Sequence, residues 1–309
     1  MKASRAPRNK TIALSGKETA FYAAKSRKLS AGKTYVPEDL CDVVLRQDAF
    51  AALDLLPDAF VDLMIVDPPY NLTKTFGGRT FKEMGLEDYK QWLDGWLKKT
   101  VRLLKEHASI YICADWKTSI AIPEVAGQYF FLQNRISWER EKGRGAKNNW
   151  KNCLEDIWFF TKSKDYVFNL DAVKMQKPVL APYRDAGGRP KDWIDSGGDK
   201  IRYTHPSNIW TDISIPFWSM AENTPHPTQK PEKLMAKLIL ASSRPGDLVF
   251  DPFLGSGTTA VTAKKLGRHY LGIEREKEYA ALAEKRLELA ETDKGIQGFE
   301  NGVFKVRNA

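Results

Sequence analysis

The apolar run LMIV at residues 63–66 is followed at once by Asp67, Pro68, Pro69 and Tyr70. Two consecutive prolines cannot continue a ladder of backbone hydrogen bonds, so a strand over this run must end at the aspartate. The unbroken apolarity favours a strand that is buried on both faces. Open α/β sheets bind ligands at the carboxyl ends of such strands, where these four residues fall. A plain surface turn is the alternative, since Asp and Pro are common turn residues.

After Pro37 the sequence alternates strand-like and helix-like segments, which is the pattern of a layered α/β sheet. The segment from about residue 139 to 225 differs, because its periodicity is poor and prolines and glycines are frequent. We interpret it as an insertion. Strands are predicted at residues 43–46, 63–66, 109–113, 136–138, 156–160, 248–250 and 269–274. Helices are predicted at residues 49–56, 86–105, 231–243 and 278–290, and a further helix follows the sequence DPFLGSGTT and ends at about residue 266.

The net charge of +9 is unevenly distributed along the 309 residues. Residues 1–33 carry nine Lys or Arg and one acid, Glu18, so almost all of the excess lies there. Few apolar residues accompany these charges, which predicts a flexible basic arm over residues 1–37 and a folded domain over residues 38–309. A basic arm favours polyanions through counterion release, although a solubilising tail has the same composition.

The sequence also bears on compartment and metal binding. No stretch approaches the roughly 18 uninterrupted apolar residues of a membrane span, and the basic N-terminus has no apolar signal core. Cys41, Cys113 and Cys153 form no CxxC pair and are most simply free thiols in a reducing cytoplasm. The four histidines lack the spacing of metal ligands, so we expect no metal site.

A second motif, FDPFLGSGTT, occupies residues 250–259, between a predicted strand and a helix. Gly255 and Gly257 let the backbone turn tightly and bring its amides close to a ligand at the helix N-terminus. The sequence lacks both the GK[ST] ending of a phosphate loop and the last glycine of the dinucleotide motif. A nucleoside ligand with a modest anionic end is therefore favoured. Glu274, at the end of the next strand, is placed to bind ribose hydroxyls.

With both motifs, the chain resembles the amino-group DNA methyltransferases that use S-adenosylmethionine, and more narrowly their β class. In that class DPPY precedes FxGxG, and the target-recognition region lies between them. The same order is seen here, with HPTQKP at residues 226–231 just before the glycine motif. RQDAF at residues 46–50 and GRGAKNNWKNCLEDIWFFTKS at residues 143–163 also resemble family segments. The similarity covers about residues 43–290, with departures at residues 107–109 and at Trp150.

The resemblance implies a Rossmann-like α/β fold, with a mixed, mostly parallel sheet, helices on both faces and an inserted target-recognition region at about 139–225. It implies S-adenosyl-L-methionine as cofactor and double-stranded DNA as substrate. A second copy of the chain, as a homodimer, and a cognate restriction endonuclease that acts separately are the other partners it suggests. The expected location is a cytoplasm of bacterial or phage type, in association with the nucleoid.

The resemblance also assigns individual residues. The catalytic residues would be Asp67, Pro68, Pro69 and Tyr70. The cofactor would be bound by Asp48, Ala49, Phe50, Asp67, Pro68, His226, Thr228, Lys230, Phe253, Gly255, Ser256, Gly257, Thr258, Thr259, Glu274 and Arg275. In this assignment adenine meets Asp48 and Phe50, and the methionine carboxylate meets Lys230 and the glycine turn. DNA would be contacted by Arg140, Lys142, Arg144, Lys147, Asn148, Trp150 and Lys151.

The chemistry of the DPPY corner can be argued from its residues. An exocyclic amine on a base is a poor nucleophile, because its lone pair is delocalised into the ring. A carboxylate and a backbone carbonyl that accept hydrogen bonds from its two N–H groups favour the tetrahedral, more nucleophilic amine. Asp67 and the carbonyl of Pro68 form such a pair. The flat ring of Tyr70 offers a stacking face to a base that has rotated out of the duplex.

Three functions are compatible with these residues. Methylation of the adenine N6 amine is the first hypothesis, because DPPY is the form usually linked with adenine in the family. Methylation of the cytosine N4 amine uses the same geometry on a similar amine. The third is a catalytically silent DNA-binding module, against which the complete DPPY and glycine motifs argue.

Overall fold

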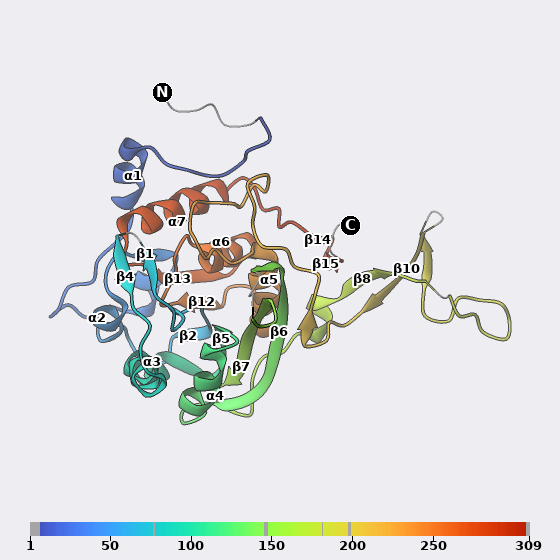
Figure 1. The fold of residues 1–309 in the computed structure, drawn as a ribbon, viewed down its shortest axis with the longest axis horizontal. Coiled ribbons are helices and arrows are strands. Elements are labelled where there is room, and N and C mark those ends of the chain that lie inside the picture. Colours follow the sequence, from blue (N-terminus) through green and yellow to red (C-terminus); the bar gives the residue numbers. More distant parts are fainter. Residues whose placement is uncertain (1–6, 77, 145–147, 181, 197–198, 307–309) are drawn as a thin grey trace.

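The computed structural model describes residues 7–76, 78–144, 148–180, 182–196 and 199–306, and its centre is one large sheet (Figure 1). In spatial order this sheet contains β1 (Val43–Leu45), β13 (His269–Ile273), β12 (Leu248–Asp251), β2 (Val61–Val66), β5 (Leu104–Asp115), β7 (Asn152–Thr161), β6 (Phe131–Arg144) and β11 (Ile209–Trp210). The first five of these strands pair in parallel, β7 pairs antiparallel with both β5 and β6, and β11 pairs in parallel with β6. The predicted mixed, mostly parallel sheet is therefore confirmed.

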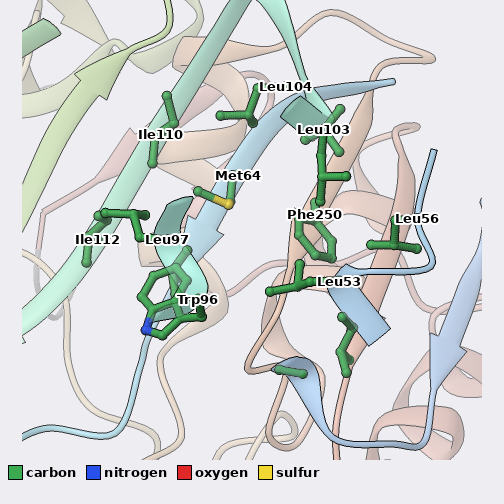
Figure 2. Packing of buried hydrophobic residues seen from close by; sticks show 14 of the residues in the cluster. Leu53, Leu56, Met64, Trp96, Leu97, Leu103, Leu104, Ile110, Ile112 and Phe250 are labelled. Atoms are coloured by element: carbon green, nitrogen blue, oxygen red, sulfur yellow. The ribbon is translucent and has the colours of Figure 1, made fainter. Parts of the chain in front are cut away.

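Helices cover both faces of this sheet, which explains the unbroken apolarity of residues 63–66 in β2. Met64 and Val66 face one core, against α2 (Ala49–Leu53), α3 (Leu86–Thr100) and α4 (Ala121–Ala126), and Figure 2 shows part of this packing. Leu63 and Ile65 face the opposite core, because successive side chains of a strand point to opposite faces. That core contains α5 (Glu232–Ser242), α6 (Thr258–Lys265) and α7 (Lys277–Leu289).

Helix α3 ends at Thr100, earlier than the predicted end at Lys105. A short 3₁₀ turn, η2 (Val101–Leu103), follows it, and Leu104 already pairs with Val61 of β2. The apolar periodicity runs on past the helix because Val101 and Leu103 of η2 and Leu104, the first residue of β5, are apolar as well. The other 3₁₀ turns are η1 (Pro37–Leu40), η3 (Thr118–Ile120) and η4 (Leu170–Val173).

The prediction of a flexible arm over residues 1–37 is wrong for its middle part. Helix α1 (Gly16–Ala23) begins at a capping box, in which the side chains of Ser15 and Glu18 bond each other's backbone N–H groups. Its buried residues, Tyr22 and Ala23, pack against Ala281 of α7, whereas Phe21 stays exposed. The Tyr22 hydroxyl also donates to Glu288 Oε1 at 2.7 Å. Local concentration of apolar contacts thus outweighs the basic composition of the segment.

The predicted insertion divides into two parts. Strands β6, β7 and β11 belong to the central sheet, whereas β8 and β10 extend away from the body of the molecule (Figure 1). The C-terminal tail, for which no element was predicted, contributes to this second sheet. Its strands, in spatial order, are β14 (Phe299–Glu300), β15 (Val303–Lys305), β8 (Met175–Pro178), β10 (Asp199–Thr204) and β9 (Ile194–Ser196).

A two-stranded hairpin, β3 (Lys74–Phe76) and β4 (Arg79–Phe81), follows the DPPY corner. Among the described residues, every helix is too short or too polar to cross a membrane.

Candidate active site

The DPPY corner and the glycine turn meet at one edge of the central sheet. Strands β2 and β12 are parallel neighbours, with Val249 opposite Leu63 and Phe250 opposite Met64, so the residues that follow each strand lie side by side. Residues of both motifs line a cavity of about 360 Å³. This volume falls within the range of small-molecule sites, about 300–1,000 Å³.

Most of the predicted catalytic and cofactor residues line this cavity. Gly257 is the exception, and it shapes the turn from behind: its φ is +87°, and a Cβ there would lie 2.7 Å from the Cβ of Ala283 in α7. The predicted residues that line the cavity are Asp48, Ala49, Phe50, Asp67, Pro68, Pro69, Tyr70, His226, Thr228, Lys230, Phe253, Gly255, Ser256, Thr258, Thr259, Glu274 and Arg275.

Helix α6 begins directly at the glycine turn, with Gly257 as its N-cap and no side chain to cap it. The first-turn amides of α6 can therefore bind a carboxylate at the positive end of the helix dipole. Arg286, fully buried on α7, supports this turn from below. Its guanidinium donates to the Ser256 carbonyl at 2.8 Å, to Thr258 Oγ1 at 3.0 Å and to Glu232 Oε1 at 2.9 Å.

Glu274 lies on the other side of the turn, after β13. Its Oε2 accepts from the Gly255 amide at 2.9 Å and its Oε1 accepts from the Glu276 amide at 2.6 Å. Burial raises the pKa of Glu274 to about 7. Each carboxylate oxygen has a further lone pair, so an ionised Glu274 could also accept from the hydroxyls of a ribose.

Asp48 and His226, two of the predicted cofactor residues, also line the cavity. Asp48 caps α2, because its Oδ1 accepts from the Phe50 amide at 3.0 Å. The His226 ring packs edge-on against Tyr279 at a centroid distance of 4.4 Å. Burial and the nearby Lys230 charge lower the pKa of His226 to about 3, so the imidazole is neutral. A neutral ring can line an apolar pocket without a counter-ion.

The DPPY corner is held by hydroxyl groups. The Tyr70 hydroxyl lies 2.9 Å from Asp67 Oδ1, and the Tyr89 hydroxyl donates to the Pro69 carbonyl at 3.0 Å. Just beyond the corner, the Asn71 amide donates to Thr118 Oγ1 at 3.1 Å. Burial, with the neighbouring Asp67 carboxylate, raises the pKa of Tyr70 well above its ordinary value, so this hydroxyl stays protonated.

Four charged side chains converge on this corner. Lys230 Nζ lies 2.6 Å from Asp67 Oδ2 and 3.3 Å from Glu155 Oε2. Glu155 Oε2 also lies 3.1 Å from the Tyr70 hydroxyl, and Glu155 Oε1 accepts from Arg140 at 2.6 Å. Lys230 thus contacts the predicted catalytic carboxylate, whereas the family resemblance had assigned it to the methionine carboxylate of the cofactor.

The predicted DNA-binding residues are spread over β6 and the loop that follows it. Arg140 lines the cavity and is bound to Glu155, and Trp150 is 92% exposed. Asn148 and Lys151 are exposed beside it. Lys142 and Arg144 belong to β6, but their side chains, like the whole of Lys147, lie outside the described residues.

Sequence reasoning missed Glu155 and Trp92. Glu155 is 4% exposed and belongs to β7, where it pairs with Asp115 of β5. An acid inside the apolar stretch LEDIWFF was the available signal, because a buried carboxylate needs a partner. Trp92 lines the cavity and also packs on Tyr89 and Phe253.

The order of the sheet, the DPPY corner and the glycine turn define a Rossmann-like α/β protein with a nucleoside-sized pocket. The chain belongs to the DNA methylase family, whose model matches residues 61–285. It is 35% identical over 259 residues to the type II methyltransferase M.HpaI of Haemophilus parainfluenzae, which covers 82% of this chain and 75% of that protein. It is also 35% identical over 258 residues to the DNA adenine methyltransferase YhdJ of Escherichia coli K12, with coverage of 80% and 83%.

Solved structures agree on the fold. A crystal structure of M1.HpyAVI with SAM aligns with a TM-score of 0.54 at 26% identity, over 79% of this chain and 98% of that one. The cytosine-N4-specific PvuII DNA methyltransferase aligns with a TM-score of 0.59 at 20% identity, over 79% of this chain and 85% of that one. At that identity the second likeness concerns the fold alone.

Proposed function

We propose that this protein methylates the N6 amine of a flipped adenine in double-stranded DNA, with S-adenosyl-L-methionine as methyl donor. The observation that carries the proposal is the shared cavity, in which Asp67 and Tyr70 after β2 lie beside the glycine turn after β12. The pocket suits the donor: Glu274 can accept from ribose hydroxyls, and the uncapped start of α6 can bind the methionine carboxylate. When bound, the donor supplies a methyl group activated by a sulfonium.

Asp67 has the central role in the proposed chemistry. Its carboxylate and the Pro68 carbonyl accept hydrogen bonds from the two N–H groups of the target amine. These hydrogen bonds localise the nitrogen lone pair for attack on the methyl carbon. The bound donor would supply the methyl group, its carbon–sulfur bond breaking as the carbon–nitrogen bond forms, and the amine would then give up one proton towards Asp67. Tyr70 stacks on the extruded base, and such stacking contributes about 1–3 kcal/mol. Positioning of amine and methyl in line supplies much of the remaining acceleration.

Adenine is favoured over cytosine by two observations. The corner reads DPPY, and the relative YhdJ, at 35% identity, is named a DNA adenine methyltransferase. Cytosine N4 is the second candidate, because both amines project from a base ring in the same way. Duplexes that contain only one of the two acceptor bases within the recognised site separate these candidates.

We also propose the remaining partners and the location. Arg140, Trp150 and the basic residues around them would contact phosphates and the extruded base, and a homodimer and a separately acting cognate restriction endonuclease would complete the system. The protein would then work in the cytoplasm at the nucleoid, where its DNA is. Sedimentation at the assay concentration tests the dimer.

The function is tested by sequencing, with detection of modified bases, DNA from cells that express the protein. N6-methyladenine at one recurrent sequence is the expected result, and it identifies target base and site together. N4-methylcytosine would establish the second candidate. DNA without any new modification, from cells that contain the folded protein, would contradict both.

A further inference from the structure

The Lys230 ammonium is bound by two residues of the DPPY corner and pairs with Glu155. It donates to Asp67 Oδ2 at 2.6 Å and to the Tyr70 hydroxyl at 3.1 Å, and Glu155 Oε2 lies 3.3 Å away. Two of the three N–H donors of the ammonium are thus used at the corner, and Glu155 is its second ion-pair partner. The side chain is only 6% exposed, which fixes it in place.

The carboxylates of Asp67 and Glu155 are close enough to need a cation between them. Both lie within hydrogen-bond distance of the same Tyr70 hydroxyl and of the same Lys230 nitrogen. Two carboxylates that share a site compete for ionisation, and one of them tends to hold a proton unless a positive charge intervenes. A protonated Asp67 could not accept a hydrogen bond from the amine at the oxygen that carries the proton.

We propose that Lys230 and Glu155 are positioning residues for methyl transfer: Glu155 holds the Lys230 ammonium against Asp67, and the ammonium keeps the Asp67 carboxylate ionised and aimed at the target amine. This proposal rests on the proposed function. It removes Lys230 from the cofactor-binding set and leaves the methionine carboxylate to the start of α6. With Arg140 on the far side of Glu155, two positive and two negative side chains offset one another.

Other titratable groups surround Lys230, and they define the background against which a pH effect is measured. Burial opposes the charge on Lys230, but Asp67 and Glu155 outweigh burial and raise its pKa, so the ammonium persists at every pH of interest. The surrounding groups are Asp67 and Tyr70 after β2, Lys74 on β3, Cys113 and Asp115 on β5, Arg140 on β6, Glu155 on β7, His226 before α5, and Asp251 on β12.

The test is the pH dependence of single-turnover methylation of unmethylated genomic DNA, between about pH 5.5 and 9, at S-adenosylmethionine concentrations that saturate the protein at every pH. Lys230→Met should move the acidic limb of the profile upward by about one pH unit or more, because an opposite charge at this range shifts a carboxylate by about 1–3 units. Raising the pH should then restore much of the lost rate. Lys230→Arg keeps the charge, so its acidic limb should stay near that of the wild type.

Glu155→Gln should move the acidic limb in the opposite direction, since it removes a negative neighbour of Asp67 while preserving shape. Its plateau rate should also fall about tenfold or more, because Lys230 loses an anchor. Opposite shifts from two adjacent substitutions are not produced by a general loss of structure. If Lys230→Met failed to bind cofactor, the direction of the Glu155→Gln shift would decide the question.

Calorimetry separates this role from cofactor binding. Lys230→Met should bind S-adenosylmethionine within about threefold of the wild-type affinity. An acidic limb that stays in place, together with a cofactor affinity that falls tenfold or more, would overturn the proposal in favour of a carboxylate-binding lysine. A wild-type protein that transfers no methyl group to any DNA would instead contradict the proposed function, and with it this inference.

Discussion

The two halves of the cavity are built in different ways. Most of the proposed cofactor half is local: the glycine turn after β12, the start of α6 and the Glu274 carboxylate after β13 all belong to residues 248–276, and Asp48 and His226 complete it. The proposed catalytic half is made of charged side chains from the β2 corner, β6, β7 and the loop before α5. Substitutions in the first half should therefore change cofactor affinity, and substitutions in the second should change the rate of methyl transfer.

The largest effect is expected at Asp67. Asp67→Ala removes the acceptor that makes the amine nucleophilic, so single-turnover methylation should fall by about 10²–10⁴-fold or more. Duplex affinity should survive, because phosphate contacts elsewhere dominate binding. Asp58→Ala, which removes a side chain that is 71% exposed on the surface, serves as the matched control and should keep its rate. A near-normal rate in Asp67→Ala would show that the amine is activated in some other way.

Gly257 provides the corresponding test of the cofactor half. Gly257→Ala combines a left-handed backbone with a clash against Ala283, whereas Gly267 has a similar φ of +74° and nothing within 4 Å of an added Cβ. Both variants should lose about 1–2 kcal/mol to backbone strain. Only Gly257→Ala should also weaken cofactor binding, by tenfold or more, as measured by calorimetry. Equal cofactor affinities in the two variants would mean that the turn tolerates displacement.

How much of the pocket was predictable follows from the same contrast. The glycine turn and Glu274 lie in one strand–turn–helix–strand segment, so the local sequence pattern predicted that they would lie close together. Glu155 could not be placed, because its position depends on β7 running antiparallel to β5, with Glu155 opposite Asp115. The S-x-x-E capping box at Ser15 was a visible helix signal. The basic composition around it was given more weight, and α1 was missed.

A moderate pH effect is expected on the cofactor half. Burial raises the pKa of Glu274 to about 7, so its carboxylate is mostly ionised at about pH 8 and mostly protonated at about pH 6. Since the ionised form accepts from ribose hydroxyls, the cofactor dissociation constant should rise about tenfold between those two pH values. Calorimetry at several pH values checks this, with Glu274→Gln as the control whose affinity should vary less.

The raised pKa of Glu274 should also affect the stability of the fold. A carboxyl whose pKa is higher in the folded state than in the unfolded state binds more protons when folded between those two values. The free energy of unfolding of the wild type should therefore fall, relative to Glu274→Gln, as the pH rises from about 4.5 to about 7. Denaturant titrations of the cofactor-free proteins measure it. A wild type that became more stable relative to Glu274→Gln over this rise in pH would contradict the assigned shift.

The smallest effect is expected from the N-terminus. Deleting residues 1–8 removes Lys2, Arg5 and Arg8 and should lower the log–log salt slope of DNA binding by about 0.9 for each phosphate that these side chains neutralise. Deleting residues 1–24 should in addition lower Tm, because it removes the packing of α1 against α7. Filter binding at several salt concentrations and thermal melts separate the two effects. An unchanged slope in the shorter deletion would favour the solubilising-tail interpretation of those residues.

The division of the cavity is tested most directly by a crystal structure of the protein with S-adenosylmethionine. The methionine carboxylate should lie at the start of α6, the ribose hydroxyls should bond to Glu274, and the methyl group should point to Asp67. Lys230 should still contact Asp67 and Glu155. A methionine carboxylate bound to Lys230, or a methyl group directed away from the DPPY corner, would contradict the separation of a backbone-built cofactor half from a charged catalytic half.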